Sequence, residues 1–212
     1  MLFRSKHIVF DVDGTLIDTE FAVLHSLQDI LKDVLGQKFS LKELEFALGI
    51  TGEKALKQLK VTDIQKTLEL WNEKLELYKD KVVVFEGIKD LLQTLTKREY
   101  QLGIVTSKTR NEYKVEVTPF ELDKYFDIII CADDTSNHKP NPEPLLKYLE
   151  LSQVDLKEII YIGDSVYDYE CATSANIDFA FAKWGNKRQN IDAKYILESS
   201  MDLLNICESL RN

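Results

Sequence analysis

The sequence predicts an α/β protein whose parallel sheet carries an inserted block of helices. Short apolar runs of β type recur along the chain, helical patterns separate the later runs, and one long interval is helical almost throughout. The apolar runs are Ile8–Phe10, Leu102–Val105, Ile128–Ile130, Ile159–Ile162 and Phe179–Ala182. Continuous apolar strands that alternate with helices are typical of a parallel sheet covered on both faces.

Helical periodicity fills the intervals between the later runs. The repeats are Ile88, Leu91, Leu92 and Leu95, and then Leu145, Leu146 and Leu149. Crossovers of a single hand between parallel strands place all their carboxyl ends at one edge of the sheet, where open α/β sheets bind ligands. We therefore predict a Rossmann-like core with its functional site at that edge.

The interval from about residue 17 to residue 85 departs from this alternation. Its apolar residues recur at helical spacing, at Leu24, Leu27, Leu31 and Val34 and again at Ile64, Leu68, Trp71, Leu75 and Tyr78. Val82–Val84 is its one candidate strand, and Asp18 or Thr19 is suited to cap its first helix. We predict a small all-helical cap domain of residues 17–85, inserted into an α/β core of residues 1–16 and 86–212.

Composition and charge exclude several classes of protein. The chain has 212 residues, 27 basic and 36 acidic side chains, and a formal charge of −9 without a basic stripe, which argues against a nucleic-acid partner. Its apolar runs are too short to span a membrane. Cys131, Cys171 and Cys207 form neither a disulfide framework nor a CxxC metal motif. We expect a cytoplasmic protein, monomeric or homodimeric, that acts on a small molecule.

Polar side chains follow four of the predicted strands at the point where each strand ends. They are Asp11 and Asp13, then Thr106, Ser107 and Lys108, then Lys139, and finally Asp164 and Asp168. Because the carboxyl ends of parallel strands meet at one edge, we expect these side chains to converge although they are far apart in the sequence.

This set of groups suits phosphate chemistry with a hard cation. Carboxylate oxygens are the ligands that Mg²⁺ prefers, and a phosphate needs N–H groups, hydroxyls and a positive charge. Gly14 and Thr15 offer backbone N–H groups, Thr106 a hydroxyl, and Lys139 an ammonium group. An aspartate with an ordinary pKa of ~3.9 is ionised at neutral pH and can attack phosphorus, while a second one protonates the leaving group.

Four motifs in order carry a resemblance to a known family. They are "DVDGTL", "GIVTSK", "KPNPEP" and "IGDSVYD", and the match extends from about residue 7 to residue 185. The sequence resembles the haloacid dehalogenase superfamily of aspartyl-phosphate hydrolases, in its subgroup with a small helical cap after the first motif.

The resemblance implies a role for each motif residue. Asp11 would be the nucleophile, and Asp13 the general acid and base. Asp164 would complete a Mg²⁺ site with Asp11 and the backbone carbonyl of Asp13, and Asp168 would orient Lys139 or a metal-bound water.

The same resemblance assigns the phosphoryl contacts and the cap. Thr106 and Lys139 would hold the phosphoryl group, with a backbone contribution from Ser107. In the cap stretch "LGITGEKALKQL", Thr51 and Lys54 would face the leaving group.

Three other residues invite interpretation without carrying chemistry. His25 and His138 have no matching ligands in the sequence, so we expect them to be structural or solvated. Asn176 tolerates a left-handed backbone, and we predict that it stops a helix.

Several activities remain open within the superfamily. Dehalogenases and phosphonatases depart from the motif at the position of Asp13, which disfavours both. β-Phosphoglucomutase relatives carry a histidine that His25 does not match in register, but the mutase alternative stays open. The chain is similar to the phosphoglycolate phosphatases and pyrophosphatases of the subgroup. We expect a Mg²⁺-dependent phosphatase of a small phosphorylated metabolite, with a non-catalytic protein that binds phosphate and Mg²⁺ as the alternative of another class.

Overall fold

A parallel six-stranded sheet forms the centre of the protein. The computed structural model describes residues 7–186 and 189–209, so the other residues of the predicted core lie outside the described ones. The sheet order is β5-β4-β1-β6-β7-β8, and every neighbouring pair is parallel. The strands are β1 His7–Phe10, β4 Gln101–Val105, β5 Ile128–Ile130, β6 Ile159–Gly163, β7 Asp178–Ala182 and β8 Tyr195–Leu197. This architecture confirms the predicted α/β fold.

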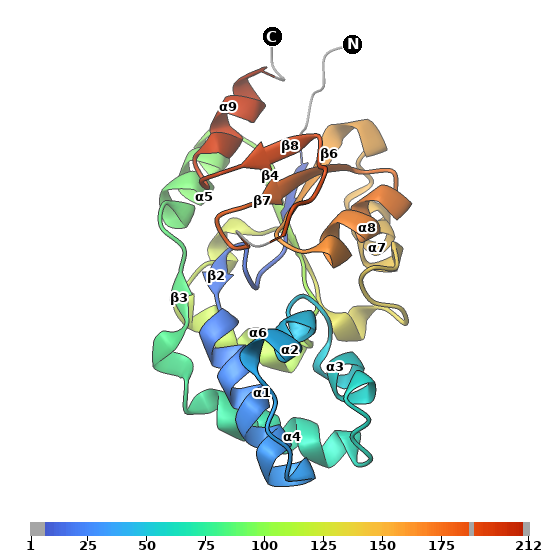
Figure 1. Ribbon diagram of the computed structural model, residues 1–212. Coiled ribbons are helices and arrows are strands. Elements are labelled where there is room, and N and C mark those ends of the chain that lie inside the picture. The colour runs from blue at the N-terminus through green and yellow to red at the C-terminus, as the bar shows by residue number, and fades with distance from the viewer. Residues whose placement is uncertain (1–6, 187–188, 210–212) are drawn as a thin grey trace.

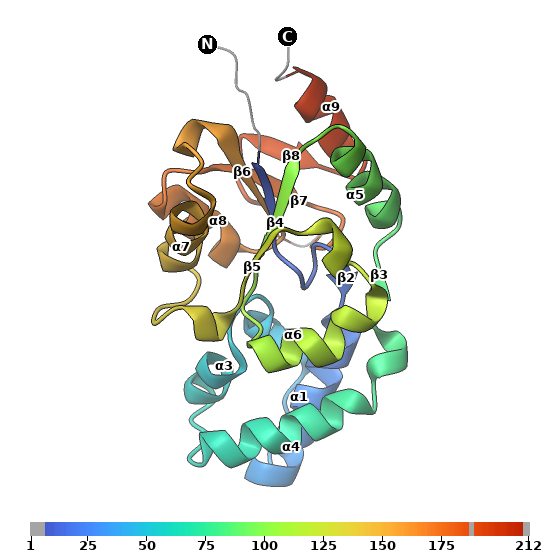
Figure 2. The same cartoon turned by 180° about the vertical axis from the view of Figure 1, so that it is seen from behind.

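Helices cover both faces of this sheet. On one side lie α5 Ile88–Lys97 and α9 Asp202–Ser209, and on the other lie α7 Glu143–Ser152 and α8 Val166–Ser174, as Figure 1 and the reverse view in Figure 2 show. Strand side chains alternate accordingly. Ile8 and Phe10 join the apolar cluster of α5, whereas Val9 joins that of α7 and α8. Burial on both faces explains why these strands are apolar without interruption.

A block of four helices lies below the carboxyl edge of the sheet (Figure 1). They are α1 Glu20–Leu35, α2 Leu41–Leu44, α3 Gly52–Gln58 and α4 Ile64–Glu76, and they enclose an apolar cluster of their own. Two short strands, β2 Ile17–Asp18 and β3 Val83–Val84, pair antiparallel where the chain enters and leaves the block. The exact domain limits at residues 17 and 85 stay a prediction.

Short 3-10 turns and one further helix complete the described part of the chain. The turns are Glu45–Ala47, Lys79–Lys81, Thr118–Phe120, Asp123–Tyr125, Ala132–Asp134 and Leu156–Glu158, and the helix is α6 Arg110–Glu116. Helix α6 follows β4 and lies between the sheet and the helical block (Figure 2).

Three local predictions can be compared with these elements. Strand β8 was not predicted, because it has only three residues and Ile196 in its centre is half exposed. Thr19 does occupy the cap position of α1, but its side chain makes no capping bond there; Asp18 instead accepts a bond from the Glu20 N–H at 3.3 Å. Asn176 has a φ of 55° directly after α8, which confirms the predicted helix stop.

Within the residues that the structure describes, none of the helices combines the length and apolar character that crossing a membrane requires.

The contact between β4 and α7 generates a stability prediction. A Cβ on Gly103 would lie 2.1 Å from the ring of Tyr148, which is fully buried. We expect Gly103→Ala to lower the free energy of unfolding by roughly 1–3 kcal/mol, because the ring has no space into which to move. Urea unfolding followed by circular dichroism measures this, with the exposed Glu73→Ala as the control. Equal unfolding midpoints for Gly103→Ala and the control would contradict the tight contact between β4 and α7.

Candidate active site

A buried lysine connects the ends of two central strands. Lys139 precedes α7, and its Nζ donates to Asp11 Oδ1 at 2.7 Å, to Asp168 Oδ1 at 2.7 Å and to the Tyr161 hydroxyl at 3.0 Å. Asp11 directly follows β1, and its own N–H donates to Ile162 of β6 at 2.8 Å. The structure thus brings together three residues that are up to 157 positions apart, 168 − 11, as the sequence predicted.

The electrostatics of this group follow from its burial. Lys139 is 1% exposed and Asp11 is 2% exposed. Burial raises the pKa of Asp11 to about 7, against the opposing pull of the Lys139 charge. For Lys139, burial lowers the pKa, but the carboxylates of Asp11 and Asp168 outweigh burial and the net shift is upward. Lys139 therefore stays charged. With a pKa of about 7, Asp11, the candidate nucleophile, is present both protonated and ionised near neutral pH.

Asp168 is a fixed partner of Lys139. Its Oδ2 accepts from the N–H of Ser165 at 3.1 Å and from the Ser165 hydroxyl at 2.5 Å, which closes the first turn of α8. Its Oδ1 accepts from Lys139 and from Tyr161, the latter at 2.9 Å. Asp168 thus contacts Lys139 directly and has neither oxygen free, while its orienting role stays a prediction.

The turn after β1 approaches Asp164 closely. Gly14 has a φ of +76°, and a Cβ there would lie 2.3 Å from Asp164 Oδ2, so only glycine fits. The N–H groups of Gly14 and Thr15 donate inside the turn, to Ile17 at 2.8 Å and to Val12 at 3.2 Å. The two donors that we predicted for phosphate are therefore engaged in this structure.

Mg²⁺ fits the carboxylates at this turn. Oxygen atoms of Asp11, Asp164 and Asp168 lie within 4.8 Å of one another. Among the described residues Asp164 has a single long bond, 3.4 Å from the Thr15 hydroxyl, and burial raises its pKa well above the usual value. A cation would offset that burial cost. Since the oxygens of Asp168 are engaged, Asp11 and Asp164 are the side chains that would hold Mg²⁺.

Three polar residues follow β4, namely Thr106, Ser107 and Lys108. The Thr106 hydroxyl accepts from the N–H of Lys108 at 3.2 Å and is buried beside the end of β4. The Ser107 hydroxyl donates to the Gly49 carbonyl at 3.0 Å and so joins the core to the helical block. We predicted no definite role for Lys108, yet it is 8% exposed.

Lys108 lies between two acids. Its Nζ is 3.0 Å from Asp13 Oδ1 and 2.6 Å from Glu116 Oε2. The Thr19 hydroxyl donates to the same oxygen of Asp13 at 2.7 Å, which explains why Thr19 does not cap α1. Burial lowers the pKa of Lys108, but the charges of Asp13 and Glu116 outweigh it and the net shift is upward. A lysine followed eight residues later by a glutamate is too common a pattern to have indicated this cluster.

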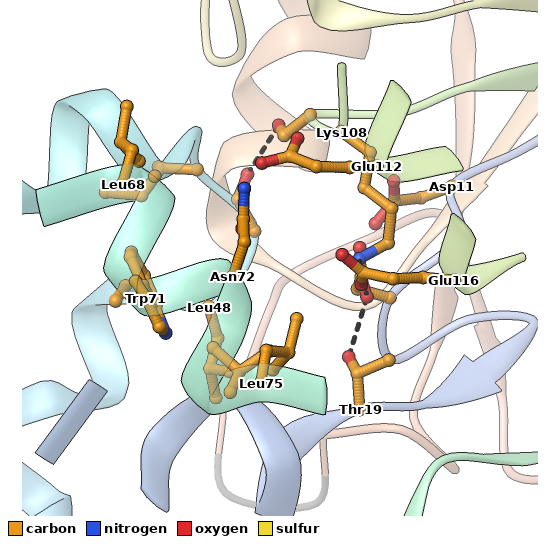
Figure 3. A pocket seen from close by; sticks show the side chains of 17 residues that line it. Asp11, Thr19, Leu48, Leu68, Trp71, Asn72, Leu75, Lys108, Glu112 and Glu116 are labelled. Atoms are coloured by element: carbon orange, nitrogen blue, oxygen red, sulfur yellow. Dashed lines mark hydrogen bonds and ion pairs between the residues drawn. The ribbon is translucent and has the colours of Figure 1, made fainter. Parts of the chain in front are cut away.

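A cavity of about 80 Å³ separates these acids from the helical block. Figure 3 shows Leu68, Trp71, Asn72 and Leu75 of α4 on one side and Lys108, Glu112 and Glu116 on the other. Asp11 and Asp13 also line it. The cavity therefore extends from the nucleophile candidate to the inner face of the helical block.

The two predicted cap residues do not line this cavity. The Thr51 hydroxyl caps α3 by accepting from the N–H of Lys54 at 3.3 Å. Lys54 Nζ donates to the backbone carbonyl of Lys139 at 3.4 Å, on the outer side of the seam between block and core. Their neighbours Gly49, Ile50 and Gly52 line the cavity instead.

The structure also shows the surroundings of His25 and His138. His25 stacks on Phe21 with ring centroids 3.8 Å apart, and its Nδ1 lies 2.9 Å from the Phe21 carbonyl, which confirms a structural position. His138 is partly buried beside Lys139, and its Nδ1 has no hydrogen-bond partner among the described residues. Neither residue lines the cavity.

Comparison with known proteins identifies the family. The model of the haloacid dehalogenase-like hydrolases matches residues 8–182, which is most of the chain. The chain therefore belongs to the haloacid dehalogenase-like hydrolase family, as the four motifs indicated.

Individual relatives cover nearly the whole chain. A protein named provisionally as the pyrophosphatase PpaX, from Caldanaerobacter subterraneus subsp. tengcongensis, is 32% identical over 94% of this chain and 93% of its own. The pyrophosphatase PpaX of Halalkalibacterium halodurans is 29% identical over 94% and 95%. A crystal structure from Lactobacillus plantarum, named provisionally as a phosphoglycolate phosphatase, has a TM-score of 0.85 at 29% identity and covers 97% of this chain and 100% of that one.

The raised pKa of Asp11 generates a prediction for the metal-free protein. Between pH 3.8 and about 7 the folded protein keeps a proton that the unfolded chain has released, so its stability falls as the pH rises through this window. Asp11→Asn does not titrate. We expect the free energy of unfolding of this variant, relative to the parent, to increase by about 2 kcal/mol from pH ~5 to pH ~8.

Urea titrations in EDTA at several pH values measure this difference. Asp80→Asn, on an exposed turn, is the matched control and should show a constant difference. The same constancy for Asp11→Asn would show that Asp11 is ionised throughout this pH range.

Proposed function

We propose that this protein is a Mg²⁺-dependent phosphatase that hydrolyses a small phosphorylated compound through an aspartyl-phosphate on Asp11. The observation that carries the proposal is the position of Asp11: buried, 2.7 Å from Lys139, and open to the same cavity as Asp13. A carboxylate placed in this way is suited to attack a phosphorus atom that enters through the cavity.

The first half of the reaction transfers the phosphoryl group to the protein. An Asp11 oxygen forms a bond to phosphorus while the bond from phosphorus to the leaving oxygen breaks, and Asp13 donates a proton to that oxygen. Lys139 and the Thr106 hydroxyl hold the phosphoryl oxygens as charge shifts. Bound Mg²⁺ supplies positive charge that favours the ionised form of Asp11 and offsets the charge of the phosphoryl group.

The second half regenerates the free enzyme. Asp13, now ionised, takes a proton from a water molecule while the oxygen of that water attacks the phosphorus. The bond between phosphorus and the Asp11 oxygen breaks, and inorganic phosphate is released. The helical block excludes other water from the site during the first half. Ser107 and Gly49, together with a bond of 3.3 Å from the Tyr167 hydroxyl to the Phe46 carbonyl, hold this block against the core.

Hydrolysis of pyrophosphate is the second candidate, since the relatives in Caldanaerobacter and Halalkalibacterium carry that name. The same Asp11 and Asp13 would act, with phosphate as the leaving group. The phosphomutase and the non-catalytic alternatives differ from both in what they release.

Release of inorganic phosphate tests the proposal. We expect turnover of para-nitrophenyl phosphate with Mg²⁺, its loss in EDTA, and a decrease of at least about 1,000-fold in Asp11→Asn, because the covalent route needs that carboxylate. Glu73→Gln, exposed on α4, is the control and should keep the parent's rate. When the reaction is run with a substrate labelled in its phosphoryl group and quenched with acid, the parent protein should carry the label and Asp11→Asn should carry none.

Two results would contradict the proposal. A folded protein that binds Mg²⁺ but releases no phosphate from any ester or from pyrophosphate would favour a binding protein. Transfer of the label to a second sugar phosphate, with no inorganic phosphate formed, would favour the mutase.

A further inference from the structure

The cavity between α4 and α6 has two chemically different walls. The wall formed by the helical block is mostly apolar, with Leu48, Ile50, Leu68, Trp71 and Leu75, and Asn72 is a polar residue on it. The Trp71 indole N–H donates to the Ser26 hydroxyl at 2.9 Å, so it is not available to a ligand. The opposite wall carries Lys108, Glu112 and Glu116 beside Asp11 (Figure 3). Asp13 also lines the cavity, 3.0 Å from Lys108.

Negative charge predominates on the charged wall. Among the described residues that line the cavity, four are acids and Lys108 is the single base. Lys108 is already paired with Asp13 and with Glu116. Glu112 lies beside the cavity, and among the described residues its Oε2 accepts from Thr109 alone, through the N–H at 2.7 Å and the hydroxyl at 2.9 Å. On this wall, the described residues therefore leave no unpaired positive group for an anionic ligand.

The mouth of the cavity is also lined by negatively charged side chains. A wider groove of about 460 Å³ shares Asn72 and Glu112 with the cavity and adds Glu53, Glu69 and Asp133. Lys and Arg are absent from its lining within the described part of the chain, and His138 is its other titratable side chain. Glu53 pairs with Lys57, and Asp133 accepts from the N–H of Arg110. A path lined by one sign of charge repels anions and concentrates cations.

Size sets a second limit. Because one water molecule needs roughly 10–15 Å³ of such space, a cavity of about 80 Å³ suits a group of several non-hydrogen atoms. In the proposed reaction the phosphoryl group would bind at the Asp11 end of the cavity, beside Lys139. The rest of the cavity would then face the leaving group.

We propose that the leaving group is a small alcohol without negative charge, and that an alcohol bearing an ammonium group is preferred. This inference rests on the proposed function and deepens it. The ammonium would lie near Glu112 and its carbon chain against Leu68 and Leu75. A carboxylate or a second phosphate in the same place would face Asp13, Glu112 and Glu116, with Lys108 withheld by two of them.

Three phosphate esters of nearly equal size test the charge. They are O-phosphoethanolamine, 2-hydroxyethyl phosphate and phosphoglycolate, whose leaving groups are cationic, neutral and anionic, and pyrophosphate is the fourth substrate. We expect kcat/KM with Mg²⁺ at neutral pH to fall in that order, with about tenfold or more between the first and the third.

Two variants test the position. In Glu112→Gln the side chain still caps α6, and we expect the advantage of O-phosphoethanolamine over 2-hydroxyethyl phosphate to shrink about tenfold. In Asn72→Lys, which adds a positive charge from the exposed side of α4, we expect kcat/KM for phosphoglycolate to rise. Glu73→Gln changes the net charge by the same amount outside the cavity and should leave the ratios of kcat/KM between the esters unchanged. Unfolding midpoints equal to the parent's show that the variants are folded.

Each outcome is informative. Phosphoglycolate or pyrophosphate turned over as fast as O-phosphoethanolamine, with Asp11→Asn inactive, would overturn this inference and leave the phosphatase intact. Ratios of kcat/KM between these esters that stay at the parent's values in both Glu112→Gln and Asn72→Lys would overturn it as well. No turnover of these four compounds or of para-nitrophenyl phosphate would overturn the proposed function, and the inference with it.

Discussion

The positive charge of Lys139 is the constraint on which the rest of the site depends. It lies in the interior with carboxylates of Asp11 and Asp168 at 2.7 Å each, and removing it would leave two buried negative charges close together. Such a group is tolerated only because every member has a partner. Asp168 has two further partners, since Tyr161 donates to its Oδ1 and Ser165 donates to its Oδ2. The end of β1, the loop before α7 and the start of α8 are thereby fixed relative to one another.

A second cluster repeats this logic on the side of the helical block. Lys108 pairs with both Asp13 and Glu116, and the Thr19 hydroxyl at the start of α1 donates to the same oxygen of Asp13. The acid that we assign to proton transfer is therefore in contact with both parts of the molecule. A movement of α1 relative to α6 would change the surroundings of Asp13 while leaving Asp11 and Lys139 in place. One carboxylate oxygen of Asp13 thus contacts both the start of α1 and Lys108 of the core.

Much of the core and of the strand-end residues could be predicted from the sequence, because apolar strands buried on both faces leave an unbroken signature and the motifs follow them in order. The convergence of Asp11, Lys139 and Asp168 needed only the parallel topology. The cavity was less accessible to prediction. Lys108 and Glu116 meet through the packing of α6, and Thr51 turned away from the cavity because its hydroxyl caps α3. Strand β8 is too short to carry a pattern of its own.

The pairing of β2 with β3 has a consequence for how such a protein can diversify. Ile17 and Val84 are partners in register, so the chain leaves the core and returns to it at neighbouring points. The four helices between them enclose a separate apolar cluster. A different helical insert whose ends lie equally close together could take their place without altering the strand order or the Lys139 cluster. Such an exchange would replace the apolar wall of the cavity, while the charged wall and the reactive groups belong to the scaffold that receives the insert.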